Sequence, residues 1–168
     1  TSLNSGKLRH HLEKTSLKKL IYDTLSLIKF QAKKKGVKLD SSIETNNIVH
    51  LNCDARRIKQ ILINLLTNAL KFTPKNGQIT LKIEAENSTL IKFTVEDTGI
   101  GIKPQDLSSL FMLFGSLSET QEKDEDKFTT GIGLGLSNVK LMLKQIGGKI
   151  SVNSELGKGT TFTVFLPF

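Results

Sequence analysis

The segment EDTGIGI, residues 96–102, places a carboxylate and two glycines directly after an apolar run. That run, residues 90–95, has the apolar and β-branched residues of a buried strand. A carboxylate at the end of such a strand is costly unless a donor meets it. The oxygens of Asp97 could accept from the exocyclic amine of a purine, with Gly99 and Gly101 leaving room for a flat ring. The alternative is an ordinary Asp-Thr-Gly turn.

Two asparagines, Asn64 and Asn68, lie about one helical turn apart in the segment DARRIKQILINLLTNALKF, residues 54–72. Asparagine is a mediocre helix residue, and amides at the edge of an apolar face need partners. Either the two amides hold neighbouring loops, or Asn68 coordinates a hard cation through its amide oxygen. In the second case Lys71, almost one turn further on, would meet phosphates around that cation.

A third segment, GIGLGL at residues 131–136, has glycines at alternate positions and opens an apolar helical pattern. Glycine allows close backbone approach, and a helix N-terminus offers free N–H groups and a partial positive charge. The segment is therefore predicted to seat a phosphate. It matches the dinucleotide motif G-x-G-x-x-G only loosely, and no strand directly precedes it, which disfavours a Rossmann fold.

A sheet and several helices must bring these segments together. Hydrophobic periodicity predicts helices over residues 16–35, over 54–72 with Asp54 as N-cap, and over 131–148, with a short helix after Pro104. Strands are predicted at residues 37–43, 48–52, 78–86, 90–96, 149–154 and 160–166, and residues 1–15 read as polar and irregular. The prediction is an α/β fold with one mostly antiparallel sheet and helices on one face.

Two apolar helix stripes should face that sheet. The predicted core residues are Leu17, Leu20, Ile21, Ile28 and Ala32 in the first helix, and Ile58, Ile61, Leu62, Leu65 and Ala69 in the second.

Composition fits a single domain with a sizeable core, because 38% of the 168 residues are hydrophobic and 24% are charged. No apolar run approaches the ~20 residues that span a bilayer, and no N-terminal signal pattern is visible. The single cysteine, Cys53, excludes an internal disulfide and a cysteine metal cluster. A reducing, cytoplasmic setting is expected for the domain, and the membrane status of a longer parent protein stays open.

The net charge of +8 favours an anionic partner without naming it. A small cluster, Lys33-Lys34-Lys35, is interpreted as a solvated helix end. Since aromatic residues do not interleave with the basic ones and no nucleic-acid motif is found, a nucleic-acid partner is not expected.

Taken together, these segments resemble the ATP-binding domain of sensor histidine kinases, in the GHKL superfamily with the gyrase, mismatch-repair and heat-shock chaperone ATPases. Residues 54–74 resemble the N box, EDTGIGI the first glycine box, and LFMLF at 110–114 the phenylalanine box. GIGLGLS and GKGTTF resemble the second and third glycine boxes. The resemblance covers nearly the whole chain. It implies a two-layer α/β sandwich of the Bergerat type, with a mixed, mostly antiparallel sheet, three main helices on one face and a mobile ATP lid.

The resemblance implies roles on the base side of a bound ATP. Asp97 would recognise adenine, with Thr98, Gly99 and Gly101 near the base, and Thr160 would support Asp97 from the last strand pair.

On the phosphate side, the resemblance implies that Asn68 binds Mg²⁺, that Asn64 and Lys71 contact the phosphates as the catalytic pair, and that Phe72 lines the nucleotide. The glycine loop would cradle the phosphates through Gly133, Leu134, Gly135 and Leu136, with Gly131 as the hinge of the lid.

The lid itself is expected at residues 115–130, which are polar and acidic, with Lys123 and Lys127 as candidates to reach the γ-phosphate. Phe111 and Phe114 would pack at the lid base.

One position separates hydrolysis from transfer in the families that this sequence resembles. The ATP-hydrolysing relatives carry a glutamate one turn before the magnesium asparagine, whereas this chain has Asn64, which cannot act as a base. Transfer to a positioned acceptor is therefore expected. His10 and His11 lack the arginine-threonine-proline turn that follows the phosphorylated histidine in the family, so residues 1–15 read as the tail of a preceding dimerisation hairpin.

The resulting hypothesis is a histidine-kinase catalytic domain, residues 16–168, that binds ATP and Mg²⁺ but does not phosphorylate itself in isolation. Its expected partners are an upstream dimerisation and phosphotransfer domain, a response-regulator receiver domain and a second parent chain in a homodimer. Two alternatives remain open: an ATP-binding regulatory or scaffold module without transfer activity, and a serine kinase domain of the mitochondrial dehydrogenase type.

Overall fold

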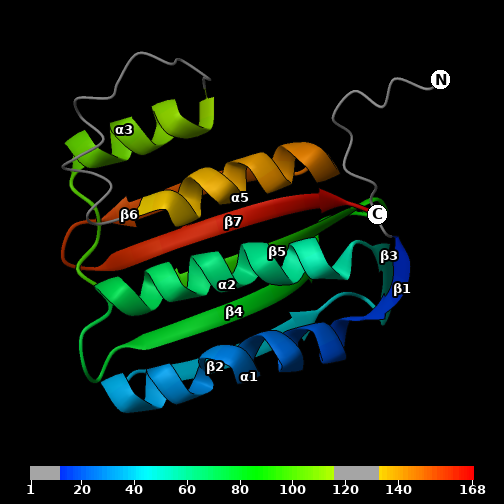
Figure 1. Ribbon diagram of the computed structural model, residues 1–168, viewed down its shortest axis with the longest axis horizontal. Coiled ribbons are helices and arrows are strands. Elements are labelled where there is room, and N and C mark those ends of the chain that lie inside the picture. The colour runs from blue at the N-terminus through cyan, green and yellow to red at the C-terminus, as the bar shows by residue number, and fades with distance from the viewer. Residues whose placement is uncertain (1–11, 116–132) are drawn as a thin grey trace.

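The protein forms two layers, a sheet and a set of helices that cover one of its faces (Figure 1). The structure, a computed structural model, describes residues 12–115 and 133–168, and the side chains of residues 110–115 and 133–134 fall outside this description. Of the expected lid at residues 115–130, Gly115 is the last residue of α3, and residues 116–130 lie outside the described residues, as do the hinge Gly131, His10 and His11.

The main sheet has five strands in the order β2-β4-β5-β7-β6. Its strands are β2 (Lys38–Glu44), β4 (Gln78–Ala85), β5 (Leu90–Asp97), β6 (Lys149–Glu155) and β7 (Gly159–Pro167). β2 runs parallel to β4, and all other neighbours are antiparallel. The predicted mixed, mostly antiparallel sheet is confirmed.

Three main helices, α1 (Leu17–Lys35), α2 (Ala55–Phe72) and α5 (Gly133–Ile146), lie side by side on one face of this sheet (Figure 1). A further helix, α3 (Pro104–Gly115), lies beyond α5 at the edge of the helix layer (Figure 1). The predicted arrangement of three main helices on one face is confirmed, as is the start of a short helix at Pro104.

The helix ends follow from local side-chain chemistry. Ser16 caps α1 by accepting from the Lys19 N–H, and Asp54 caps α2 by accepting from the Arg57 N–H at 3.3 Å. Gly36 ends α1 with φ of 76°, a left-handed conformation that glycine adopts without a Cβ clash.

The core lies between the layers. All ten predicted stripe residues of α1 and α2 are buried, and they pack against the inward-facing residues of the strands, among them Ile79, Leu81, Phe93 and Phe162. Alternate residues point to the other, open face of the sheet, where ion pairs join Lys82 to Glu96 and Lys92 to Glu84.

The prediction of a single sheet and of an irregular N-terminal segment is wrong for residues 13–15. Strand β1 (Glu13–Ser16) pairs with β3 (His50–Cys53) in a separate two-stranded antiparallel sheet, next to the cap of α2 (Figure 1). The Leu17 N–H extends this pairing with a 3.0 Å bond to the Val49 carbonyl. β1 is short and polar, and its partner is remote in the sequence, so periodicity could not reveal the pairing.

Candidate functional site

The carboxylate of Asp97 ends β5 in the interior, where its residue is only 6% exposed. Its Oδ1 accepts two backbone N–H bonds, from Gly99 at 2.8 Å and from Thr160 at 3.2 Å. Thr160 therefore supports Asp97 through its backbone, since the two residues lie opposite each other in the β5–β7 register.

The other carboxylate oxygen, Oδ2 of Asp97, receives no donor from the described residues. In this part of the chain every buried polar side-chain atom has a hydrogen-bond partner, so Oδ2 must reach the surface. One oxygen is thus fixed by the backbone while the other can accept from a ligand.

Burial raises the pKa of the Asp97 carboxyl above its ordinary value of 3.8. The N–H groups of Gly99 and Thr160 act in the opposite direction, and the charge of Glu96 adds to the rise. A ligand that donates to Oδ2 would stabilise the ionised form, because a hydrogen bond to the carboxylate opposes the desolvation that raises the pKa.

Glycines let three backbone segments meet around Asp97. A Cβ on Gly99 would lie 2.6 Å from the Phe72 carbonyl oxygen, and one on Gly101 would lie 2.2 Å from the Glu155 carbonyl oxygen. On Gly159 it would lie 2.0 Å from the Asp97 carbonyl oxygen. Each distance is far too short for any side chain, so the close approach itself requires glycine at these positions.

Ser154 connects the loop after Asp97 with strand β7, and sequence reasoning missed it. Its Oγ accepts from the Ile102 N–H at 2.9 Å and donates to the Gly159 carbonyl at 2.9 Å, with Thr160 Oγ1 at 2.8 Å. The strand pattern contains one signal for it: Ile150, Val152 and Ser154 share the inward face of β6, where a serine is unusual.

The C-terminal half of α2 contacts both other segments of the site. The Phe72 carbonyl accepts from the Ile100 N–H at 3.2 Å, which holds the loop after Asp97. Eight residues earlier, the Asn64 side chain donates to the Gly135 carbonyl at 3.4 Å, which holds the first turn of α5. The structure therefore brings together the three segments that the sequence singled out.

The two asparagines of α2 differ in their partners. Asn64 is half-buried, bonds Gly135 and also accepts from Gln60 at 3.3 Å, so it connects α2 to α5. Asn68 is also half-buried, but its amide bonds no described residue. The reading that both amides hold neighbouring segments thus applies to Asn64, and no contact among the described residues supports it for Asn68.

The remaining predicted residues surround this region. Thr98 is exposed, and its hydroxyl accepts from the Gln78 N–H at 2.9 Å, which fixes the turn after β5. Phe72 is half-buried at the end of α2, and Lys71 is exposed beside it.

Gly133, Leu134, Gly135 and Leu136 form the first turn of α5, so their backbone N–H groups lie at a helix N-terminus. The Leu136 side chain is fully buried in the core, which leaves only its backbone for a phosphate.

Within residues 12–115 and 133–168, no group of three or more His, Cys, Asp or Glu side chains could hold a metal ion.

A buried carboxylate beside close-packed glycines, and a glycine-rich helix N-terminus bonded to the same helix α2, are features of a nucleotide-binding domain on this two-layer fold. The chain belongs to the family of histidine kinase-, DNA gyrase B-, and HSP90-like ATPases, whose model matches residues 53–168. The recognition made from the sequence motifs is confirmed.

Similar proteins narrow the class further. The chain is 40% identical over 171 residues to "Hybrid signal transduction histidine kinase B" of Dictyostelium discoideum, covering 99% of this chain and 8% of that protein. It resembles the crystal structure of full-length ShkA in complex with AMPPNP, with a TM-score of 0.79, 28% identity, and coverage of 98% of this chain and 32% of that chain. It also resembles histidine kinase ThkA in complex with response regulator protein TrrA, with a TM-score of 0.69, 27% identity, and coverage of 94% and 42%.

The chain spans only 8% to 31% of the length of the first four relatives it matches. It is thus the ATP-binding catalytic domain of the histidine-kinase type, and none of these comparisons favours the scaffold or serine-kinase alternatives.

The first prediction compares two glycines that share a left-handed backbone. Gly159→Ala should lower the free energy of unfolding by about 2–4 kcal/mol, because backbone strain adds to a collision with the Asp97 carbonyl. Gly157→Ala is the matched control: its Cβ meets nothing within 4 Å, so strain alone should cost about 1–2 kcal/mol. Urea unfolding measures both, and equal losses would show that the approach of Gly159 to Asp97 is not tight.

The second prediction concerns pH. Because burial raises the pKa of Asp97, ionisation disfavours the folded state as pH rises from 3.8 through the folded pKa. Asp97→Asn keeps an acceptor for Gly99 and Thr160 but does not ionise. The unfolding free energy of the variant minus that of the wild type should therefore increase across this window and then level off. Parallel curves in urea titrations at several pH values would contradict the raised pKa.

Proposed function

We propose that this chain binds ATP with Mg²⁺ and, within a longer protein, delivers the γ-phosphoryl group to a histidine on an upstream dimerisation domain. The observation that carries the proposal is the double connection of α2, which bonds the loop after Asp97 through Phe72 and the first turn of α5 through Asn64. Base and phosphates would thereby be held by one rigid helix. The histidine-kinase relatives and the AMPPNP complex of ShkA support this proposal.

Adenine would be recognised at Asp97. The surface oxygen, Oδ2, would accept from the exocyclic amine, while Oδ1 stays bonded to Gly99 and Thr160. Guanine presents a carbonyl at the same position, so two acceptors would face each other. Gly99 and Gly101 would clear space for the ring, with Thr98 and Phe72 at its edges.

The phosphates would lie at the N-terminus of α5, where backbone N–H groups of Gly133, Leu134, Gly135 and Leu136 are available. Mg²⁺ would neutralise phosphate charge there, held by the amide oxygen of Asn68. Lys71 would stabilise charge on the transferring group. The hinge role of Gly131 and the lid belong to this proposal as expectations from the sequence.

Transfer is proposed in preference to hydrolysis because of Asn64. A neutral amide cannot take a proton from water, and its Nδ2 is already bonded to the Gly135 carbonyl. Asn64 would instead position the phosphate-binding turn. The acceptor of the phosphoryl group is proposed to lie on another domain.

The partners of the longer protein follow from the same class. A receiver domain of a response regulator is proposed as the next acceptor, supported by the ThkA–TrrA complex, and a homodimer is proposed for the parent chain. We also propose residues 1–15 as the segment that joins the dimerisation hairpin to this domain, and a cytoplasmic location for it. Among the described helices, none has the length and apolarity needed to cross a bilayer.

The third prediction tests adenine recognition. Asp97→Ala should weaken ATP binding about tenfold to a hundredfold, because the amine loses a buried acceptor, and should leave the weaker GTP binding almost unchanged. Glu96→Ala is the matched control, since Glu96 is the adjacent carboxylate but is exposed and pairs with Lys82 on the open face. Calorimetric titrations on folded variants would refute the adenine role if the Asp97 variant bound ATP like the wild type.

The fourth prediction tests the metal ligand. Asn68→Ala should weaken ATP binding strongly with Mg²⁺ and little with EDTA, because the lost amide is proposed to bind the metal. Asn64→Ala, which removes the contact with Gly135, should weaken binding by a similar factor in both conditions. If the two variants show the same metal dependence, Asn68 has a structural role.

A further inference from the structure

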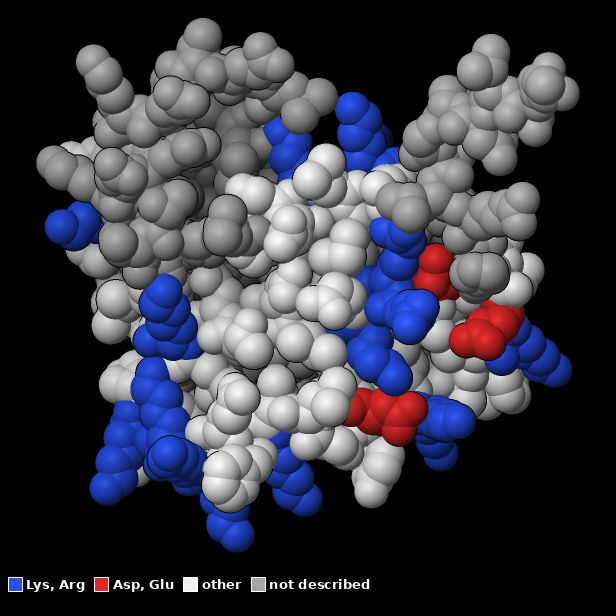
Figure 2. Space-filling model, in the orientation of Figure 1, with Lys and Arg blue, Asp and Glu red and all other residues white. Residues whose placement is uncertain are grey.

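The outer surface of the helix layer carries almost exclusively positive charge. α1 contains Lys18, Lys19, Lys29, Lys33, Lys34 and Lys35, and α2 and α5 add four and two further basic residues. The acidic residue among these three helices is Asp23. Figure 2, which views the molecule from the helix side, shows many basic and few acidic side chains on this face.

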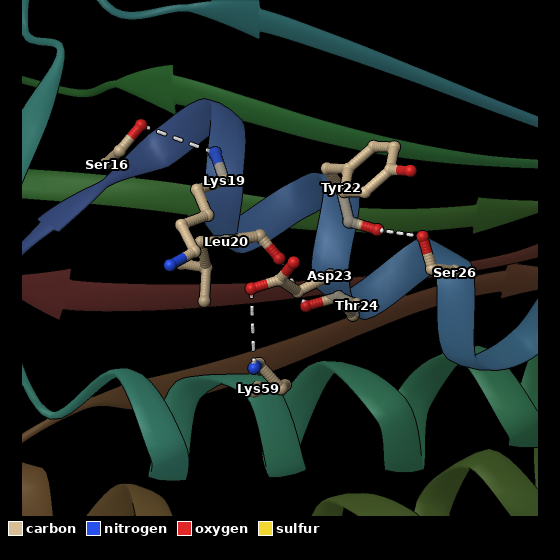
Figure 3. Close-up of polar contacts among 8 residues, drawn as sticks. All are labelled: Ser16, Lys19, Leu20, Tyr22, Asp23, Thr24, Ser26 and Lys59. Carbon is tan, nitrogen blue, oxygen red and sulfur yellow. Dashed lines mark hydrogen bonds and ion pairs between the residues drawn. The ribbon is translucent and has the colours of Figure 1, made fainter.

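Asp23 offsets one of these positive charges, that of Lys59 on α2, and leaves the other lysines of α1 unbalanced by an acidic residue of the three helices. Its carboxylate pairs with the Lys59 ammonium at 3.8 Å, while the Tyr22 ring points away from α2 (Figure 3). The open face of the sheet is different, because its lysines alternate with glutamates in ion pairs such as Lys92–Glu84 and Lys92–Glu86. The predominance of positive charge is therefore specific to the helix layer.

Two aromatic side chains are exposed among the lysines of α1, an arrangement that the sequence analysis, which found no interleaved aromatics, did not reveal. Tyr22 is 73% exposed and Phe30 is 74% exposed. At 3.6 residues per turn, Lys19, Tyr22, Ser26, Phe30 and Lys33 fall within an arc of about 80° on the outer side of α1. The opposite side of the helix, with Leu17, Ile21 and Ile28, fills the core, so these aromatics are not needed for packing.

We propose that the outer face of α1 binds an anionic lipid bilayer, with Tyr22 and Phe30 in the headgroup region and the flanking lysines on the acidic headgroups. Clustered lysines attract an anionic membrane surface, and aromatic side chains are favoured at the level of the headgroups. Each lysine near an anionic surface contributes independently, so a broad positive layer suits a flat partner.

An acidic protein is the competing partner, and the composition of the face disfavours it. Lysine is depleted at the cores of protein–protein interfaces, whereas here lysines immediately surround the two aromatics. Helix α5, on the far side of α2 (Figure 1), has a similar pattern, with Leu141 54% exposed beside Lys140 and Lys144. The inference does not depend on nucleotide binding, because no residue on the outer face of α1 belongs to the proposed ATP site.

The chain provides its own probe for this surface. It contains one tyrosine and no tryptophan, so its intrinsic fluorescence reports on Tyr22 alone. The experiment mixes the full chain with vesicles of phosphatidylcholine, or of phosphatidylcholine and phosphatidylserine, and measures cosedimentation and acrylamide quenching of Tyr22. Only the anionic vesicles should bind the chain and protect Tyr22, and high salt should release it.

Two variants with the same change in net charge separate the α1 face from general attraction. Lys18→Glu with Lys29→Glu should weaken binding to anionic vesicles about tenfold or more, since both lysines flank the aromatics. Lys103→Glu with Lys149→Glu, on exposed residues before α3 and at the start of β6, should weaken it less than about threefold, because long-range attraction is screened. Phe30→Ser should weaken binding without changing its salt dependence.

ATP affinity, measured on the same samples, should be unchanged in all three variants and thus shows that each is folded. Equal binding to both vesicle types, or equal losses in the two lysine variants, would overturn the proposal. A third result would also overturn it: anionic vesicles leave the quenching of Tyr22 unchanged, whereas an acidic, aromatic peptide reduces it. That result would identify this face as a protein-docking surface.

Discussion

The structure depends on keeping one carboxylate, Asp97, inside the layer interface. An ionised group that is 6% exposed is tolerated there only because two backbone N–H groups bond its Oδ1. Those donors are in place only if β7 lies in the observed register and the chain turns sharply at Gly99. Gly159 must also be a glycine, since β7 approaches the Asp97 carbonyl too closely for a side chain. A single polar group thereby constrains two strands and a loop.

Helix α2 connects this region to the first turn of α5. Its apolar stripe, with Leu65 and Leu66 fully buried, fixes the helix on the sheet, so its C-terminal half has little freedom to move. The Phe72 carbonyl and the Asn64 amide then bind segments that are far apart in the sequence. Stability and the site therefore share the same packing, and the polar groups that contact other segments lie at the edge of the apolar stripe.

The two faces of the molecule differ in how their charges are distributed. The open face of the sheet balances its charges in short ion pairs, which suits a surface that meets water. The helix layer concentrates positive charge and exposes Tyr22 and Phe30, although the core does not require either side chain to be outside. The same fold and net charge could occur with the basic residues spread evenly over both faces, so this asymmetry is a property of the particular sequence.

The sequence by itself determined the helices, the main strands and the chemical type of the site, because each depends on local signals: caps at Ser16 and Asp54, the apolar periods, and glycine clusters beside polar residues. It did not determine the β1–β3 sheet, the role of Ser154 or the difference between Asn64 and Asn68. Each of these depends on a partner remote in the chain, such as Cys53 for Glu13 and Gly135 for Asn64. Only the tertiary structure brings such partners together, since packing of the helices on the sheet sets which polar atoms meet and which remain available.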